Sequence, residues 1–190
     1  MANKTRSPAP KAPLTPEQII RLRRLKLQEA NTVTGFLKKL LLFLAVILLL
    51  FTVFFGVKPM VGNDMKPSFH TGDLLLYYRL TREYRAGDVV VYTADGAQYV
   101  GRIAAVGGDT VEITEQSTVK INGSTVMEAD IYYQTPRYGD EVLYPVTLAN
   151  GEVFILCDFR DGGKDSRYFG AVPLTRVKGQ VIAALRRSQL

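Results

Sequence analysis

Few side chains in this sequence could do covalent chemistry, and three of them follow one another closely. Asp64, Lys66 and Ser68 stand at alternate positions of one short segment. A hydroxyl nucleophile needs a base within hydrogen-bond reach, and side chains two residues apart do not reliably converge, so Lys66 and Ser68 make a weak pair. Asp64 could instead share a proton with Asp158 or Asp165, but only if the fold brings two carboxylates together.

The sequence has one histidine and one cysteine. His70 stands in a turn beside Gly72, where we expect a solvated loop residue. Cys157 ends the apolar stretch 153–156, which favours a buried core thiol over a reactive one. A single cysteine excludes an intramolecular disulfide. No motif for a metal or a cofactor is present, so we expect neither.

One apolar run dominates the N-terminal half of the chain. Residues 40–57 (LLLFLAVILLLFTVFFGV) carry no charge. At about 1.5 Å per residue the run nearly reaches across a hydrocarbon core. Residues 1–39 precede it and Lys58-Pro59-Met60 follow it, a pattern typical of a retained anchor and not of a cleaved leader. We predict a transmembrane anchor over 40–57.

The charges are unevenly distributed. Residues 1–39 hold nine of the 24 basic residues but only two of the 18 acidic ones. The positive-inside rule then predicts a cytoplasmic tail over 1–39, a single-pass protein of the cell membrane, and an extracytoplasmic domain over 58–190. Because that domain is nearly neutral, we expect no nucleic-acid partner.

The basic tail has a recognisable helix start. Thr15-Pro16-Glu17-Gln18 combines an N-cap threonine, a proline at the first helical position and a glutamine that closes a capping box. The short helix it opens is basic and roughly amphipathic. It could lie on an anionic inner leaflet, or it could be a solvated lead-in to the anchor. Residues 1–14 are predicted to be disordered.

Beyond the anchor, short stretches rich in Val, Ile and Tyr alternate with Gly-Asp and Asn-Gly pairs, which is typical of strands joined by turns. The predicted strands cover residues 74–79, 88–93, 98–106, 110–114, 118–121, 142–147, 152–157 and 179–185. No helical period interrupts the series. The domain is therefore predicted to be mainly β.

Five segments, in this order behind an anchor, resemble the type I signal peptidases, serine-lysine proteases that cleave secretory leader peptides. The matching segments are 62–68 (nucleophile box), 87–92, 100–111 (lysine box), 120–123 and 157–170. The resemblance implies a signal peptidase I-like (LexA-like) β fold on a single N-terminal transmembrane helix, with 115–150 as an accessory insertion. It assigns a structural role to Asp158, Arg160, Asp165, Ser166 and Arg167.

Two positions depart from the family's pattern. Asp64 stands where the family has its nucleophilic serine, and Gly101 stands where it has its general-base lysine. An aspartate has no proton to give at neutral pH and a glycine offers no amine. Because loss of either member of such a pair lowers the rate by several powers of ten, we predict that the chain is not an enzyme.

The same pair of changes is found in signal-peptidase-like proteins of the SipA type, which accompany pilus genes in Gram-positive bacteria. The resemblance implies a chaperone or assembly factor in pilus polymerisation that holds a pilin or another secreted chain in a degenerate peptidase groove by β-augmentation, with sortase as a further partner. The alternatives are an atypical but active signal peptidase that cleaves leader peptides, and a scaffold that recruits sortase or pilin through its cytoplasmic tail or its span.

The groove is predicted to include the two altered positions, with a partner side chain received by Asp64 and by the space beside Gly101. Its predicted lining is Gly62, Asn63, Asp64, Met65, Pro67, Tyr99, Val100, Gly101 and Arg102. The Tyr-rich segment 132–138 offers either an exposed aromatic surface for a partner or a local hydrophobic core.

Overall fold

The structure is a computed structural model that describes residues 15–126, 131, 133–139 and 141–186. The chain forms two compact units, Met1–Leu49 and Leu50–Leu190, and each is described by itself. The predicted disordered segment 1–14 and Tyr132 lie outside the described residues.

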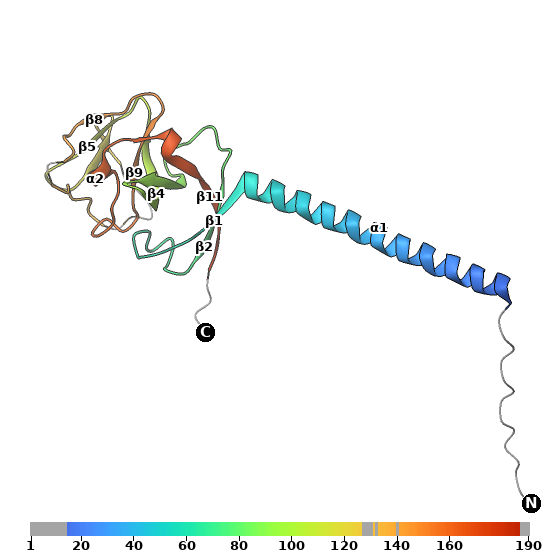
Figure 1. The fold of residues 1–190 in the computed structure, drawn as a ribbon. Coiled ribbons are helices and arrows are strands. Elements are labelled where there is room, and N and C mark those ends of the chain that lie inside the picture. The colour runs from blue at the N-terminus through green and yellow to red at the C-terminus, as the bar shows by residue number, and fades with distance from the viewer. Residues whose placement is uncertain (1–14, 127–130, 132, 140, 187–190) are drawn as a thin grey trace, which may run out of the picture. The chain divides into compact units, whose positions relative to one another are not determined.

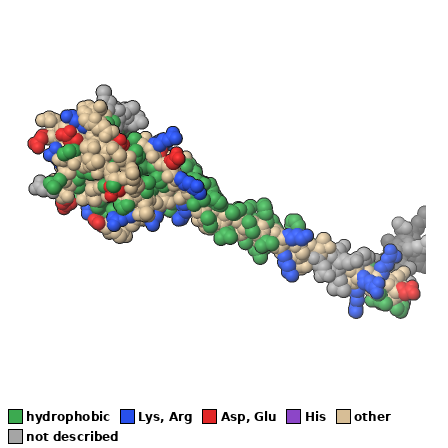
Figure 2. Space-filling view, turned by 90° about the horizontal axis from the view of Figure 1, so that it is seen from above, with side chains coloured by type: hydrophobic (Ala, Val, Ile, Leu, Met, Phe, Trp, Pro, Cys, Tyr) green, Lys and Arg blue, Asp and Glu red, His purple; other side chains and the backbone are tan. Residues whose placement is uncertain are grey.

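Helix α1 (Pro16–Phe54) opens with the predicted capping box. The Thr15 N–H donates to Gln18 Oε1 (3.1 Å) and the Gln18 N–H donates to Thr15 Oγ1 (3.4 Å). Basic side chains lie near this start, and apolar side chains cover the later stretch (Figure 2). Within α1, Thr32–Phe54 is long and apolar enough to cross a membrane. The basic segment continues into this stretch as one helix, not as a separate short one.

The helix ends three residues before the end of the predicted anchor, because residues 55–57 belong to a strand. Phe55 pairs with Tyr78 and Val57 pairs with Leu76. The apolar run 40–57 is therefore shared between the helix and the β domain.

The domain is mainly β, as predicted, and contains two antiparallel sheets (Figure 1). The larger sheet has the order β1-β2-β11-β3-β4-β9-β10. Its strands are β1 (Phe55–Pro59), β2 (Leu74–Tyr78), β3 (Val89–Ala94), β4 (Ala97–Val106), β9 (Glu152–Leu156), β10 (Val172–Pro173) and β11 (Val177–Leu185). The smaller sheet has the order β7-β6-β5-β8, with β5 (Thr110–Ile113), β6 (Val119–Ile121), β7 (Ser124–Thr125) and β8 (Val146–Thr147).

Strand β11 lies between β2 and β3 and changes partners along its length. It pairs with β3 through residues 177–180 and with β2 through residues 180–185. The register shifts between Val181 and Ala183, which marks a bulge. A bulge bends its strand, but the pairing with β2 continues past it to Leu185, whereas the pairing with β3 ends at Gln180 and Val90, close to the start of β3.

Alternating side chains of the large sheet form the core. One buried cluster packs beneath the segment that follows β1, and it includes Met60, Met65, Leu75, Val100 and Cys157. Two short helical elements follow β9: α2 (Ser166–Phe169) and the 3₁₀ turn η1 (Leu174–Arg176). The buried position of Cys157 agrees with the core role expected from the sequence.

Candidate functional site

Asp64 lies in a tight turn between β1 and β2. The Lys66 N–H donates to the Asn63 carbonyl (3.0 Å) and the Phe69 N–H donates to the Met65 carbonyl (2.8 Å). The Met65 side chain is fully buried and fixes the turn on the core, while Asp64 beside it is half-buried. The turn therefore presents the Asp64 side chain from a rigid base.

The segment after β9 fixes the Asp64 backbone from the other side. The Phe159 N–H donates to the Asp64 carbonyl (2.9 Å). A Cβ on Gly163 would lie 3.3 Å from Asp64 Cβ and 2.3 Å from Cys157 Sγ. Only a glycine leaves room there for both side chains. No signal in the sequence distinguished Gly163 from the other glycines.

The Asp64 carboxylate has no hydrogen bond and no salt bridge to any residue that the structure describes. Burial raises the pKa of this carboxyl, and the negative charge of Asp165 raises it further. The carboxylate is thus partly desolvated and uncompensated, which is a costly state for a charged group.

Asp158, in contrast, is fully buried and closely paired. The Arg102 guanidinium binds both of its oxygens, from Nε (2.9 Å) and from Nη2 (2.7 Å), and the Ser68 hydroxyl donates to it at 2.5 Å. Arg102 also reaches the Gly87 carbonyl (3.0 Å). This network joins β4, the Asp64 turn and the segment after β9, so its role is to hold the site together.

Asp165 is also paired. It accepts two bonds from the Arg167 guanidinium, both 2.9 Å, and caps α2 through the Arg167 N–H (3.0 Å). Its Oδ2 also accepts from the Cys157 N–H and thiol, each at 3.0 Å. Among the described residues, no hydrogen bond joins the Asp64 carboxylate to Asp165 or to Asp158, so these residues do not form a pair of carboxylates that shares a proton.

The buried residues Asp158, Arg160, Asp165, Ser166 and Arg167 are called the buried box, and a strap formed by residues 133–138 packs against it. Arg160 donates to Thr135 Oγ1 (2.8 Å) and the Tyr138 hydroxyl donates to the Arg160 carbonyl. The Arg167 guanidinium stacks on the Tyr138 ring, 4.0 Å from its centroid. Burial is the first cause of the raised pKa of the Tyr138 hydroxyl.

The strap also brings an aromatic ring against Phe159, whose N–H is bonded to the Asp64 carbonyl. The rings of Tyr133 and Phe159 meet edge to face with centroids 5.1 Å apart. Both residues lie in segments that the sequence analysis singled out, but nothing in the sequence indicated that they touch.

The predicted open space beside Gly101 is absent. A Cβ on Gly101 would lie 2.5 Å from Ile155 Cγ2, 3.2 Å from the Leu156 carbonyl oxygen and 3.4 Å from Tyr92 Cε1. The side chains of β3 and β9 fill this position, so it cannot receive a partner side chain. The expectation of a vacant lysine position is thus corrected by cross-strand packing.

The other predicted groove residues have several different environments. Met65 and Val100 are buried in the core, and Arg102 is held by Asp158. The Tyr99 ring packs between the rings of Tyr92 and Phe169, with centroid separations of 5.8 Å and 5.2 Å respectively. Near Asp64, Gly62 is half-buried, and Asn63 and Pro67 are exposed.

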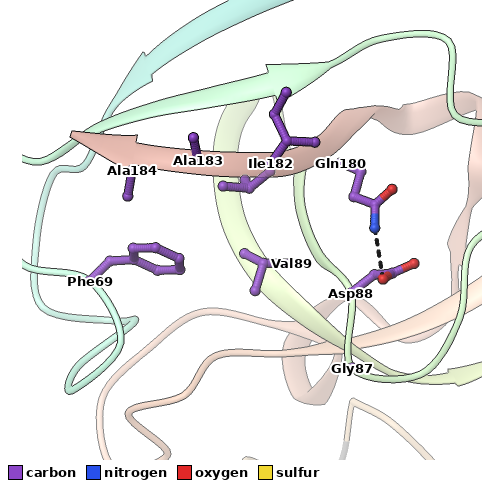
Figure 3. Close-up of a pocket in the computed structure, with 9 residues that line it drawn as sticks. Phe69, Gly87, Asp88, Val89, Gln180, Ile182, Ala183 and Ala184 are labelled. Atoms are coloured by element: carbon purple, nitrogen blue, oxygen red, sulfur yellow. Dashed lines mark hydrogen bonds between the residues drawn. The ribbon is translucent and has the colours of Figure 1, made fainter.

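A hollow of about 390 Å³ opens where the pairing of β11 with β3 ends (Figure 3). Phe69, residues 87–89 and residues 180–184 line it, and none of the predicted groove residues does. Gln180 Nε2 donates to Asp88 Oδ1 (2.7 Å) at one side of it. Phe69 links this hollow to the Asp64 turn, because its N–H is bonded to Met65.

Residues 33–185 match the family described as signal peptidase, peptidase S26, and the chain belongs to that family. A probable signal peptidase I-1 of Synechocystis sp. is 26% identical over 157 residues, which cover 75% of this chain and 78% of that protein. A signal peptidase I of Bacillus amyloliquefaciens is 27% identical over 164 residues, covering 80% and 84%. The crystal structure of a signal peptidase I from Enterococcus faecalis is 26% identical, covers 53% of this chain and 98% of that one, and gives a TM-score of 0.44.

These relatives contradict the prediction that the chain is not an enzyme. They are named signal peptidases, and nothing in the comparison points to an inactive form. The residues at positions 64 and 101 did not justify that prediction, because it inferred the activity of the whole protein from two side chains alone. Together with the apolar helix, the family indicates a membrane-anchored protein.

Proposed function

We propose that the β domain binds an extended segment of a secreted polypeptide at Asp64 and holds that chain for assembly. By analogy with the signal-peptidase-like proteins that accompany pilus genes, the bound chain is a pilin and sortase is a further partner. The basic residues that precede the span favour an orientation in which the tail is cytoplasmic and the β domain is extracytoplasmic, where such chains emerge.

The observation that carries this proposal is the state of Asp64. Its backbone is held on two sides, by the turn after β1 and by Phe159, while its half-buried carboxylate has no partner among the described residues. Rigid placement of an unsatisfied polar group is what a binding site requires. The hollow that begins at Phe69, which has both apolar and polar lining residues, offers a neighbouring place for a side chain of the same segment.

Cleavage of a leader peptide is the second candidate function. It is favoured by the relatives, which are named signal peptidases. The two candidates share the bound segment and differ in what happens to it.

Site-specific photocrosslinking tests the binding step. A photoreactive residue at Asn63, which is exposed beside Asp64, should crosslink to a secreted chain in cells that express the full-length protein. Leu143 serves as the control position because it is also exposed and lies outside the site. Equal yields at the two positions would contradict binding at Asp64. Normal pilus polymers in a strain that lacks the protein would contradict the assembly role.

Incubation of the full-length protein in detergent with a preprotein tests the second candidate. Cleavage that is lost on Asp64→Ala and retained on Asp95→Asn, an exposed carboxylate in the β3–β4 turn, would assign hydrolysis to this site. A crosslinked but intact preprotein would favour holding alone.

A further inference from the structure

The Asp64 side chain and the Phe159 ring lie over two consecutive glycines. A Cβ on Gly163 would approach Asp64 Cβ to 3.3 Å, and a Cβ on Gly162 would approach Phe159 Cε1 to 3.1 Å. The hydrogen bond between the Phe159 N–H and the Asp64 carbonyl joins the two residues directly. Asp64 and Phe159 are therefore neighbours through their main chains and beside the same pair of glycines, and we call the place that they form the Asp64 site.

Tyr133 extends the Asp64 site with a second ring. It meets Phe159 edge to face, and 39% of its surface is exposed. The strap holds it there through Thr135, which is buried and bonded to Arg160. Rings of this kind present electron-rich faces, which attract the cationic groups of lysine and arginine.

The charges at the Asp64 site favour the same kind of guest. The Asp64 carboxylate has no cationic partner among the described residues. The guanidinium groups of Arg102 and Arg167 are already paired, the first with the Asp158 carboxylate and the second with the Asp165 carboxylate. A guest cation would supply the missing charge, whereas a guest carboxylate would be repelled.

We propose that Asp64, Phe159 and Tyr133 form a subsite for a lysine or arginine side chain of the bound segment. This inference rests on the proposed function and adds the class of side chain that the site selects. The ammonium or guanidinium group binds Asp64, and the methylene groups behind it pack against the two rings. An apolar side chain of equal length fits the rings but leaves the carboxylate unpaired.

Capped alanine-rich peptides that differ only at their central residue test the subsite. The probes carry lysine, arginine, norleucine or glutamate and are titrated into the full-length protein in lipid nanodiscs. We expect lysine and arginine peptides to bind about tenfold more tightly than norleucine, as for one partly solvated charge-assisted hydrogen bond. The glutamate peptide should bind most weakly.

Three variants connect that preference to the site. Asp64→Asn should make lysine and norleucine peptides bind equally, and Phe159→Leu should weaken the lysine peptide several-fold. Asp95→Asn makes the same chemical change at an exposed turn and should leave the preference unchanged. Thermal unfolding of each variant is measured first. Asp64→Asn keeps the shape of the side chain and breaks no bond between described residues, so it should fold.

The outcomes separate the subsite from the proposed function. Failure of every peptide to bind, together with no crosslink at Asn63, would overturn both. Binding without a preference for lysine, or with a preference that survives Asp64→Asn, would overturn the subsite and leave the holding function in place. A preference that Phe159→Leu does not change would remove the aromatic part of the subsite.

Discussion

Gly101→Ala tests whether the position beside Gly101 is filled. In the interior of a strand, alanine is ordinarily favoured over glycine by about 0.5–1 kcal/mol, because glycine loses more backbone freedom on folding. Here the new Cβ would lie 2.5 Å from Ile155 Cγ2 and 3.2 Å from the Leu156 carbonyl oxygen. Overpacking of a core costs about 1–3 kcal/mol. We therefore expect a net loss of about 1–2 kcal/mol in the free energy of unfolding.

A double-mutant cycle with Ile155→Ala identifies the cause. This change removes Cγ2 and by itself costs about 2–5 kcal/mol through the cavity it leaves. In the double variant the methyl group introduced at position 101 occupies part of that cavity, so the combined loss should fall short of the sum by about 0.5–3 kcal/mol.

Urea unfolding of the full-length protein in detergent, followed by far-UV circular dichroism, measures all four corners of the cycle. Gln98→Ala, at an exposed position of the same strand, is the control and should change stability by less than about 0.5 kcal/mol. A Gly101→Ala variant at least as stable as the wild type, or losses of stability that simply add in the double variant, would refute the reasoning. Either result would indicate that the position beside Gly101 is open.

Three further predictions concern the buried box and Asp64. Asp64→Asn should stabilise the protein at neutral pH, because folding raises the pKa of the Asp64 carboxyl through burial and through the charge of Asp165. The gain should vanish below about pH 4, where the wild-type carboxyl is protonated in both the folded and the unfolded state. A difference in melting temperature that does not change with pH would contradict this prediction. Arg167→Met should cost about 3–5 kcal/mol, because Asp165 would remain buried without its partner; a loss below about 1 kcal/mol in thermal unfolding would argue against a strong pair. The Cys157 thiol, whose pKa is raised by burial, should resist maleimide in the native protein and react in urea, so rapid native labelling would disprove its burial.

The sequence predicted the β architecture well because the signals for strands and turns are local. Alternating Val, Ile and Tyr between Gly-Asp pairs placed β2, β3, β4 and β9 within one or two residues of their observed positions. The capping box at Thr15 was equally local and is present. The short strands β1, β7 and β10 were missed because they depend on their partners and not on their own composition.

The site was harder to predict because its contacts join distant parts of the chain. The sequence identified Asp64 and Gly101 but could not show that Ile155 fills the space beside Gly101. The contact between Tyr133 and Phe159 depends on how the strap folds over the box. Hydropathy also did not locate the end of the helix, because apolar residues in β1 and apolar residues in a membrane helix have the same hydropathy.

The position of β11 has a consequence for the order in which the domain can be made. Strand β11 (Val177–Leu185) connects the β1–β2 pair to the rest of the large sheet, β3-β4-β9-β10. Before residues 177–185 have been synthesised and exported, these two parts of the sheet cannot join. Pairings between residues so far apart in the chain form late and slowly. In the proposed orientation, the large sheet can close only after this stretch has been exported, so export and completion of the fold are coupled in time. A chain arrested earlier would expose two unpaired sheet edges to its neighbours.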